Sequence, residues 1–259
     1  MEMVETKLFE AASKGSIDSL KKLLKEDLLI LDRVFINCFS ETPLHVAALL
    51  GHIDFVTEII RIKPQLITEL NSLQSSPLHL ASAKGHVEIV RALLSVNPRM
   101  CLARDRNGLT PLHLAAQKGR VEVMTELLHA EPDAARLTLY GGENILHLCV
   151  KHYQLEALKL LVSTISETEF VNAKDNDGNT VLHLAVADKQ VETINFLLTV
   201  AAIEVNSLNL NGKTPRDTLI QTRRHVRDLE IQESLKRVGG FGNQNTSCWP
   251  YGSFGREDG

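Results

Sequence analysis

Apolar and small side chains recur along this chain with a period of 34 to 36 residues. In each copy a small residue stands two positions after an anchor, and an apolar pair stands fourteen and fifteen positions after it. In the first four copies a glycine lies between them, six positions after the anchor. Several features that keep one phase indicate an internal repeat. The anchor is a histidine in five copies: His45, His79, His113, His147 and His183.

One copy, from Asp105 to Leu128, shows what each repeat is expected to form. Gly108 suits a tight turn that needs a positive φ. Thr110 can cap a first helix, and Pro111 fits the first turn of that helix. Gly119 ends the first helix, and apolar residues at helical spacing then predict a second helix. Two helices this short cannot bury their apolar faces alone, so the copies must stack side by side.

Three copies share a proline nineteen residues after the anchor: Pro64, Pro98 and Pro132. Proline at this place ends the second helix, because it lacks a backbone N–H and restricts the residue before it. We expect the following residues to form extended arms that lead to the next turns, at Gln65–Asn71, Arg99–Asp105 and Asp133–Tyr140.

The core Thr110-Pro111-Leu112-His113, with the small residues and glycine that follow it, resembles the ankyrin repeat. The resemblance extends from residue 5 to residue 237, with five good copies between two degenerate ones that read as caps. It implies an all-α ankyrin-repeat solenoid of helix-turn-helix units with short β-turn or hairpin fingers and about seven repeats. We expect one repeat domain over 1–238, with repeats near 5–31, 37–70, 71–104, 105–138, 139–174, 175–208 and 209–238, and a separate tail over 239–259.

The proline, the arm and the Asp/Asn-x-x-Gly turn together are similar to plant immunity-associated ankyrin proteins, which are membrane-anchored. Such proteins carry a multi-span domain with a Pro-Gly-Gly motif after the repeats, whereas this sequence has a glycine- and aromatic-rich tail. Either the chain is truncated, or it is a splice form with an unrelated end. The tail reads as disordered, and the alternative is a short docking motif built on its aromatic residues.

The composition limits which partners and which cellular compartment we expect for the chain. With 28 basic and 32 acidic residues, a formal charge of −4 gives no general attraction to nucleic acid. The four cysteines lack metal-type spacing and are expected to be free thiols in a reducing compartment. No apolar run reaches the roughly 18 to 20 residues that a membrane span needs, and the start lacks a signal peptide. We therefore expect a cytoplasmic protein, at the cytosolic face of the plasma membrane if a membrane domain is normally attached.

Catalytic, cofactor and metal sites are not expected. The five anchor histidines are interpreted as structural, each linking adjacent turns through its ring. His52 and His86, which follow the bend glycines, are interpreted as packing residues. The chain contains no phosphate-binding loop and no nucleophile elbow.

The leading hypothesis is therefore a scaffold or adaptor that binds proteins through a concave surface, and the family resemblance adds a role in plant defence signalling. The alternative is the N-terminal cytosolic module of a plasma-membrane multi-span protein. Phe39, Arg106 and Tyr140 are the first expected hot spots, although each could instead pack on a neighbouring turn. The full set of candidates comprises Phe39, Glu41, Leu73, Arg106, Asn107, Leu109, Tyr140, Glu143, Asn176 and Asp177 on turn tips, and Leu49, Leu50, Lys84, Gln117, Lys118, Lys151, His152 and Asp188 on first helices.

Overall fold

The computed structural model describes residues 2–33, 41–165, 167–220 and 226–240. Its regular elements over these ranges are all helices, and they contain no strand. The chain divides into two compact units, Met1–Asn176 and Asp177–Gly259. Within each unit the helices come in pairs, with one short first helix and one second helix per repeat, as the sequence pattern predicts.

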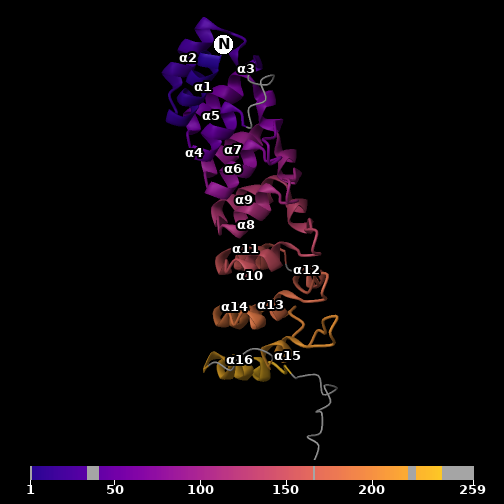
Figure 1. Cartoon of the computed structure of the whole chain (residues 1–259). Helices are drawn as coiled ribbons and strands as arrows, with labels where there is room; N and C mark the ends of the chain where they lie inside the picture. Colours follow the sequence, from indigo (N-terminus) through magenta and orange to yellow (C-terminus); the bar gives the residue numbers. More distant parts are fainter. Residues whose placement is uncertain (1, 34–40, 166, 221–225, 241–259) are drawn as a thin grey trace, which may run out of the picture. The chain divides into compact units, whose positions relative to one another are not determined.

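In the first unit, the first helices pack on one another in chain order, and so do the second helices (Figure 1). The turns between repeats lie beyond the start of each first helix. The helix pairs are α1 (Glu2–Lys14) with α2 (Ile17–Glu26), α4 (Pro43–Leu50) with α5 (Ile53–Ile62), α6 (Pro77–Lys84) with α7 (Val87–Val96), α8 (Pro111–Gln117) with α9 (Val121–Ala130), and α10 (Ile145–Lys151) with α11 (Leu155–Thr164). Two single-turn helices, α3 (Ile30–Arg33) and α12 (Thr168–Val171), follow the first and last pairs.

Local residues set where the first helices start. Thr42, Ser76, Thr110 and Asn144 are the N-caps, and each side chain accepts a hydrogen bond from the backbone N–H of the anchor histidine three residues later. The histidine ring in turn accepts from the N-cap backbone N–H, which completes a capping box. Such reciprocal caps satisfy donors that a helix start leaves unpaired.

Glycine sets where these helices stop. Gly51 and Gly85 take the left-handed conformation, with φ of 88° and 90°, and their N–H groups bond back into the helix. Glycine adopts this conformation at little steric cost. Two repeats after Gly85, Tyr153 replaces the glycine and still has a φ of 58°. The surrounding packing therefore keeps the bend without a glycine.

The prediction of extended arms after the prolines is wrong. Each proline instead opens a short 3₁₀ helix: η1 (Pro64–Thr68), η2 (Pro98–Leu102) and η3 (Pro132–Arg136). Proline suits a first helical position because its φ is already helical and its missing N–H would have no partner there. The 3₁₀ turn also buries apolar side chains under the second helices, namely Leu66, Ile67, Cys101, Ala134 and Ala135.

The core of the first unit runs between the two layers of helices. It is lined by leucines one residue before each anchor histidine and by the small residues two positions after it, all fully buried: Leu44, Leu78, Leu112, Leu146, Ala47, Ala81, Ala115 and Cys149. Leu93 and Leu127 enter it from the second helices and are also fully buried. Small residues allow the first helices to approach one another closely, which is what the repeat pattern implies.

The second unit repeats this plan with α13 (Val181–Ala187), α14 (Val191–Leu197), α15 (Pro215–Ile220) and α16 (Val226–Arg237). Helix α13 packs on α15, and α14 packs on α16. In the last copy Asp217 replaces the anchor histidine, and its carboxylate accepts from the Thr214 N–H at 3.0 Å and from the Thr214 hydroxyl at 2.8 Å. The degenerate copy thus keeps its helix cap with a different residue.

Two expectations fall outside this description. The tail from residue 241 onward and the candidate Phe39 both lie outside the described residues. In the part of the chain that the structure does describe, no helix has the length and apolar character needed to cross a lipid bilayer.

Candidate protein-binding surface

The anchor histidines join each turn to the next one along the stack. Nε2 of His45 donates to the Ser75 carbonyl at 2.9 Å, and Nε2 of His79 donates to the Leu109 carbonyl at 3.2 Å. His113 does the same to the Leu137 carbonyl at 3.1 Å. Within the second unit, His183 lies 3.0 Å from the Lys213 carbonyl.

The hydrogen bonds and burial of His45, His79 and His113 favour the neutral ring. The carbonyl can only accept, so Nε2 carries the hydrogen, while Nδ1 accepts from the N-cap backbone, as from the Thr42 N–H at 3.2 Å. Burial lowers the pKa of His45 and of His113 to about 4, and it lowers the pKa of His79 as well. A ring with both nitrogens committed cannot serve as a metal ligand or a proton-transfer group.

A second set of contacts joins the bends between paired helices. Nε2 of His52 donates to the Ser13 carbonyl at 2.9 Å, and Nε2 of His86 donates to the Leu49 carbonyl at 3.1 Å. Both rings pack against the bend glycine of the preceding repeat, as the sequence predicts, and they also form hydrogen bonds to that repeat. The signal in the sequence was the Gly-His pair, which occurs at 51–52 and again at 85–86.

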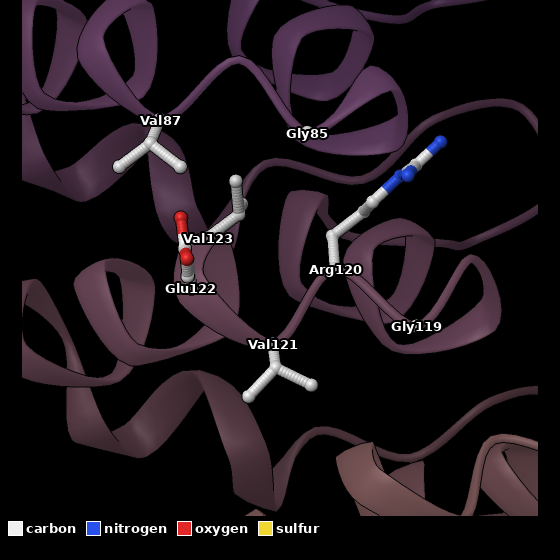
Figure 2. Close-up of a pocket in the computed structure, with 7 residues that line it drawn as sticks. All are labelled: Gly85, Val87, Gly119, Arg120, Val121, Glu122 and Val123. Carbon is white, nitrogen blue, oxygen red and sulfur yellow. The ribbon is translucent and has the colours of Figure 1, made fainter.

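Glycine at the bends leaves room for these side chains. A Cβ atom added at Gly51 would lie 2.7 Å from Cε1 of His86, and one added at Gly85 would lie 2.9 Å from Cδ of Arg120. A hollow of about 310 Å³ lies beside the bend at Gly85. Figure 2 shows Arg120 extending from its bend toward Gly85, with Val87 and Glu122 to one side of the hollow. The lining offers one guanidinium and one carboxylate, and this pair does not make a catalytic or metal-binding set.

Hydrogen bonds from backbone N–H groups hold the turn tips in place. The Asp105 carboxylate accepts from the N–H groups of Asn107 and Leu109, each at 2.9 Å. The next contact reaches back to the preceding turn: Arg106 donates through its backbone N–H to the Leu73 carbonyl at 2.9 Å. Tips that are fixed in this way present their outward side chains in defined positions, which favours binding because little order must be gained.

Two of the expected hot spots, Tyr140 and Arg106, are exposed and also pack on a neighbouring turn. Tyr140 is 85% exposed, yet its ring lies over the preceding turn, where a Cβ at Gly108 would come within 2.8 Å of Cε2. Arg106 is exposed, and its guanidinium donates to the Ser72 carbonyl at 2.9 Å. Both side chains therefore pack on a neighbouring tip and still offer an open face to a partner.

The other candidates of the first unit lie along the first helices and their turns. Leu50 is 48% exposed and Leu73 is 57% exposed. Lys84, Asn107, Lys118, Lys151 and Asn176 are exposed, whereas Glu41, Leu49, Leu109, Gln117, Glu143 and His152 are partly buried. In the second unit, Asp177 and Asp188 are exposed.

Some candidates are close enough to interact. Lys151 forms an ion pair with Glu143. Burial lowers the pKa of His152, and the nearby charges of Lys118 and Lys151 lower it further. The C-terminal ends of α8 and α10 thus place Lys118 and Lys151 near one histidine, together with Glu143.

Arg104 is a turn residue that the sequence reasoning missed. Its guanidinium donates to the Gly108 carbonyl at 2.8 Å and to the Thr138 carbonyl at 3.1 Å, so it bridges two successive turns. Nothing in the repeat pattern marks it, because the corresponding positions in the other copies carry different residues.

Among the described residues, no group of three or more His, Cys, Asp or Glu side chains is arranged to hold a metal ion. Burial raises the pKa of the Cys101 and Cys149 thiols to about 12, so neither is an activated nucleophile. The described surface presents side chains that differ from repeat to repeat on a framework of packed helices and hydrogen-bonded turns.

Comparison with known proteins supports the interpretation of the chain as a repeat protein. Residues 59–136 and 132–209 match a family model described as ankyrin repeats in three copies. Over 245 residues the chain is 49% identical to the ankyrin repeat-containing protein BDA1 of Arabidopsis thaliana, and the match covers 92% of this chain and 57% of that relative. The chain therefore spans little more than half the length of this relative.

The fold itself matches a solved structure. The ankyrin repeat domain of Bcl-3, a member of the IkappaB protein family, aligns with a TM-score of 0.72 over 88% of this chain and 97% of that domain. At 22% identity the likeness shows the fold alone. It confirms the predicted all-α solenoid of stacked helix pairs.

Proposed function

Because this chain belongs to the ankyrin repeat family, we propose that it is a scaffold or adaptor that binds partner proteins. The binding region of the proposal is the first-helix surface, which consists of the outward side chains of α4, α6, α8 and α10 and of the turns at residues 71–75, 105–109 and 139–143. Ankyrin repeats in general mediate protein–protein interaction, and the fold adds no chemistry of its own.

One observation carries this proposal: side chains at equivalent surface positions differ, whereas the buried ones repeat. Five residues after the anchor stand Leu50, Lys84, Lys118 and His152 in successive copies. At the buried positions the same copies keep the anchor histidine and the leucine before it. A scaffold that is held constant under a varied surface is typical of proteins that separate folding from recognition.

Apolar side chains on this surface add to the argument. Leu50, Leu73 and Tyr140 keep about half or more of their surface in water. A partner that covers them gains hydrophobic stabilisation of roughly 25 cal/mol for each Å² of apolar surface removed from water. Aromatic and arginine side chains are common hot spots, so Tyr140 and Arg106 are proposed as anchors.

Affinity capture with mass spectrometry tests the proposal. The full chain and the variant L50A/L73A/Y140A serve as baits in a plant extract. We expect the variant to lose partners that the wild-type chain retains. The matched control is L29A/V96A/L102A, which removes the same number of exposed apolar side chains outside the first-helix surface. Thermal unfolding of all three baits checks that the fold is kept. Identical partner sets for wild type and L50A/L73A/Y140A would contradict the proposal.

We further propose that the pathway is plant defence signalling in the cytoplasm. The similarity to an Arabidopsis protein and the resemblance in the proline and turn pattern support this assignment. The captured partners test it directly, since defence components should be enriched among those that L50A/L73A/Y140A loses.

A second candidate function is the N-terminal cytosolic module of a plasma-membrane multi-span protein. The observation that favours it is that the chain covers only 57% of its Arabidopsis relative. Sequencing the full-length transcripts distinguishes the two candidates. A continuation with several apolar spans would support the module, and a stop codon directly after residue 259 in every transcript would contradict it.

A further inference from the structure

Acidic residues are distributed unevenly between the two helix layers of the first unit. The second helices α5, α7, α9 and α11 contain six carboxylates: Asp54, Glu58, Glu88, Glu122, Glu126 and Glu156. The first helices α4, α6, α8 and α10 contain none. The chain as a whole is acidic, with a net charge of −4, so these four helices depart from the charge of the rest of the molecule. The carboxylates of the first-helix surface, Asp105 and Glu143, lie on its turns.

Lysines stand at the ends of three successive first helices. Lys84 ends α6, Lys118 caps α8 and Lys151 ends α10, and all three are exposed. Lys84 and Lys118 stand five residues after the anchor in adjacent repeats, and Lys151 stands four residues after it in the next one. Because α6 packs on α8 and α8 packs on α10, the three lysines form a row along the C-terminal ends of successive first helices. The charges of Lys118 and Lys151 both act on His152, whose pKa they lower in addition to the effect of burial.

The row is only partly neutralised. Glu143 pairs with Lys151, whereas Lys84 and Lys118 form no ion pair with any residue that the structure describes. A lysine at a helix C-terminus also interacts favourably with the helix dipole. That stabilising role accounts for each lysine singly, but not for the absence of carboxylates from all four first helices.

Apolar side chains lie on the same surface as the lysines. Leu50 and Leu73 are about half exposed, and Leu80 and Leu114 on the outward sides of α6 and α8 are partly exposed. A complementary partner therefore needs negative charges together with apolar side chains, which is a property of an acidic protein segment.

The spacing of the row limits the conformation of that segment. Packed helices lie about 8–10 Å apart, so successive lysines belong to supports separated by about this distance. A polyproline II segment advances by about 9 Å in three residues and returns to the same side. A strand-like segment instead places every third side chain on the opposite face.

We propose that the first-helix surface binds an extended acidic segment of a partner protein, with carboxylates at every third residue facing Lys84, Lys118 and Lys151. This proposal rests on the proposed adaptor function and names the chemistry of the partner. Residues between the carboxylates supply apolar side chains to Leu50, Leu80 and Leu114.

Fluorescence anisotropy with labelled synthetic peptides tests this inference on the full chain. The probe consists of Glu-Pro-Leu triplets, in which proline favours the polyproline II conformation. One control peptide has the same composition with all glutamates clustered at one end, and another has Gln in place of Glu. We expect binding of the triplet peptide to weaken with added salt and to exceed binding of either control.

Charge variants show which surface binds the probe. We expect K84E/K118E to weaken binding of the triplet peptide by on the order of tenfold, because two favourable charge contacts become repulsive. The variant K22E/K25E on α2 changes the net charge equally and should bind the peptide as wild type does. If K84E/K118E unfolds at a lower temperature than wild type, K84Q/K118Q replaces it and should weaken binding in the same direction.

Three results would overturn the inference: equal binding by K84E/K118E and K22E/K25E, equal binding of the triplet and clustered peptides, or equally tight binding of a single-stranded oligonucleotide with the same charge. Failure of this inference is separable from failure of the adaptor function. Partners that L50A/L73A/Y140A loses but K84E/K118E retains would support the adaptor function and contradict the binding of an acidic segment.

Discussion

At the scale of single residues, the anchor histidine performs two structural tasks at once. Its Nδ1 accepts from the N-cap backbone, as in the 3.3 Å contact from the Thr110 N–H to His113, and its Nε2 donates to the next turn. Both tasks need a neutral ring, because a protonated Nδ1 becomes a donor and loses the bond from the cap. His129, by contrast, is exposed and is not one of the anchor histidines.

Stability should therefore depend on pH through these rings. The folded pKa of His45 and of His113 is about 4, below the value of about 6.5 for an unfolded chain. Between these values the unfolded state binds more protons, so the free energy of unfolding is fully retained above about pH 6.5 and falls as the pH drops toward 4. The loss is on the order of 3 kcal/mol for each ring.

Urea unfolding at a series of pH values measures this effect. We expect the midpoint to fall steadily below pH 6.5, and the variant H113Q to show a shallower fall than wild type. The control L29A should keep the wild-type slope, since Leu29 is exposed and has no titrating group. A midpoint that stays constant from pH 7 down to pH 5 would show that the rings are not buried as neutral groups.

At the scale of elements, each helix pair depends on its neighbours for its core. Leu93 on α7 and Leu127 on α9 are fully buried, and α7 packs on α9 and on the 3₁₀ helix η2. The second helices thus contribute to a core that no single repeat encloses. Side chains at their buried positions should matter for the whole stack, not for one helix alone.

Replacing either leucine with alanine should remove transfer free energy and leave a cavity. We expect L93A and L127A each to lower the free energy of unfolding by about 2–5 kcal/mol. The same change at the exposed Leu29 should alter it by less than about 0.5 kcal/mol. Denaturant midpoints compare the three variants, and wild-type stability of both L93A and L127A would refute the stacked core.

At the scale of the molecule, the main helix contacts among the described residues of the first unit join adjacent repeats. Among the described helices, α1 packs on one neighbouring first helix, α4, whereas α6 packs on both α4 and α8. In such a series, stability is the sum of the repeats and their interfaces, so an end repeat is held by one interface and an inner repeat by two.

Hydrogen exchange should follow this arrangement. Amides of α1 and α2 should exchange faster than those of α6 and α8, because α1 packs on one first helix and α6 and α8 each pack on two. Mass spectrometry after a series of labelling times measures the order. Equal protection of all four helices would mean that the first unit unfolds as one cooperative block, which contradicts the prediction.

Sequence alone determined the repeat, its phase and the limits of its first helices, because these depend on contacts within a few residues. Thr110, Pro111 and Gly119 act on their own turn of chain, so capping and bend chemistry could be predicted without neighbours. The varied positions of the first-helix surface could be located for the same reason, since their phase follows from the anchor. The extended arms were predicted wrongly, because the burial of Leu66 and Ile67 under the second helix favours a 3₁₀ turn.

Only the tertiary structure decided the contacts between repeats, which join residues 24 to 39 positions apart in the chain. It showed that His52 and His86 donate to preceding bends, that Arg104 bridges two turns, and that the exposed Tyr140 also covers Gly108. The row formed by Lys84, Lys118 and Lys151 likewise appears only when the first helices lie side by side. The physical reason is that a local pattern sets each repeat, whereas the surface it presents depends on how successive repeats are stacked.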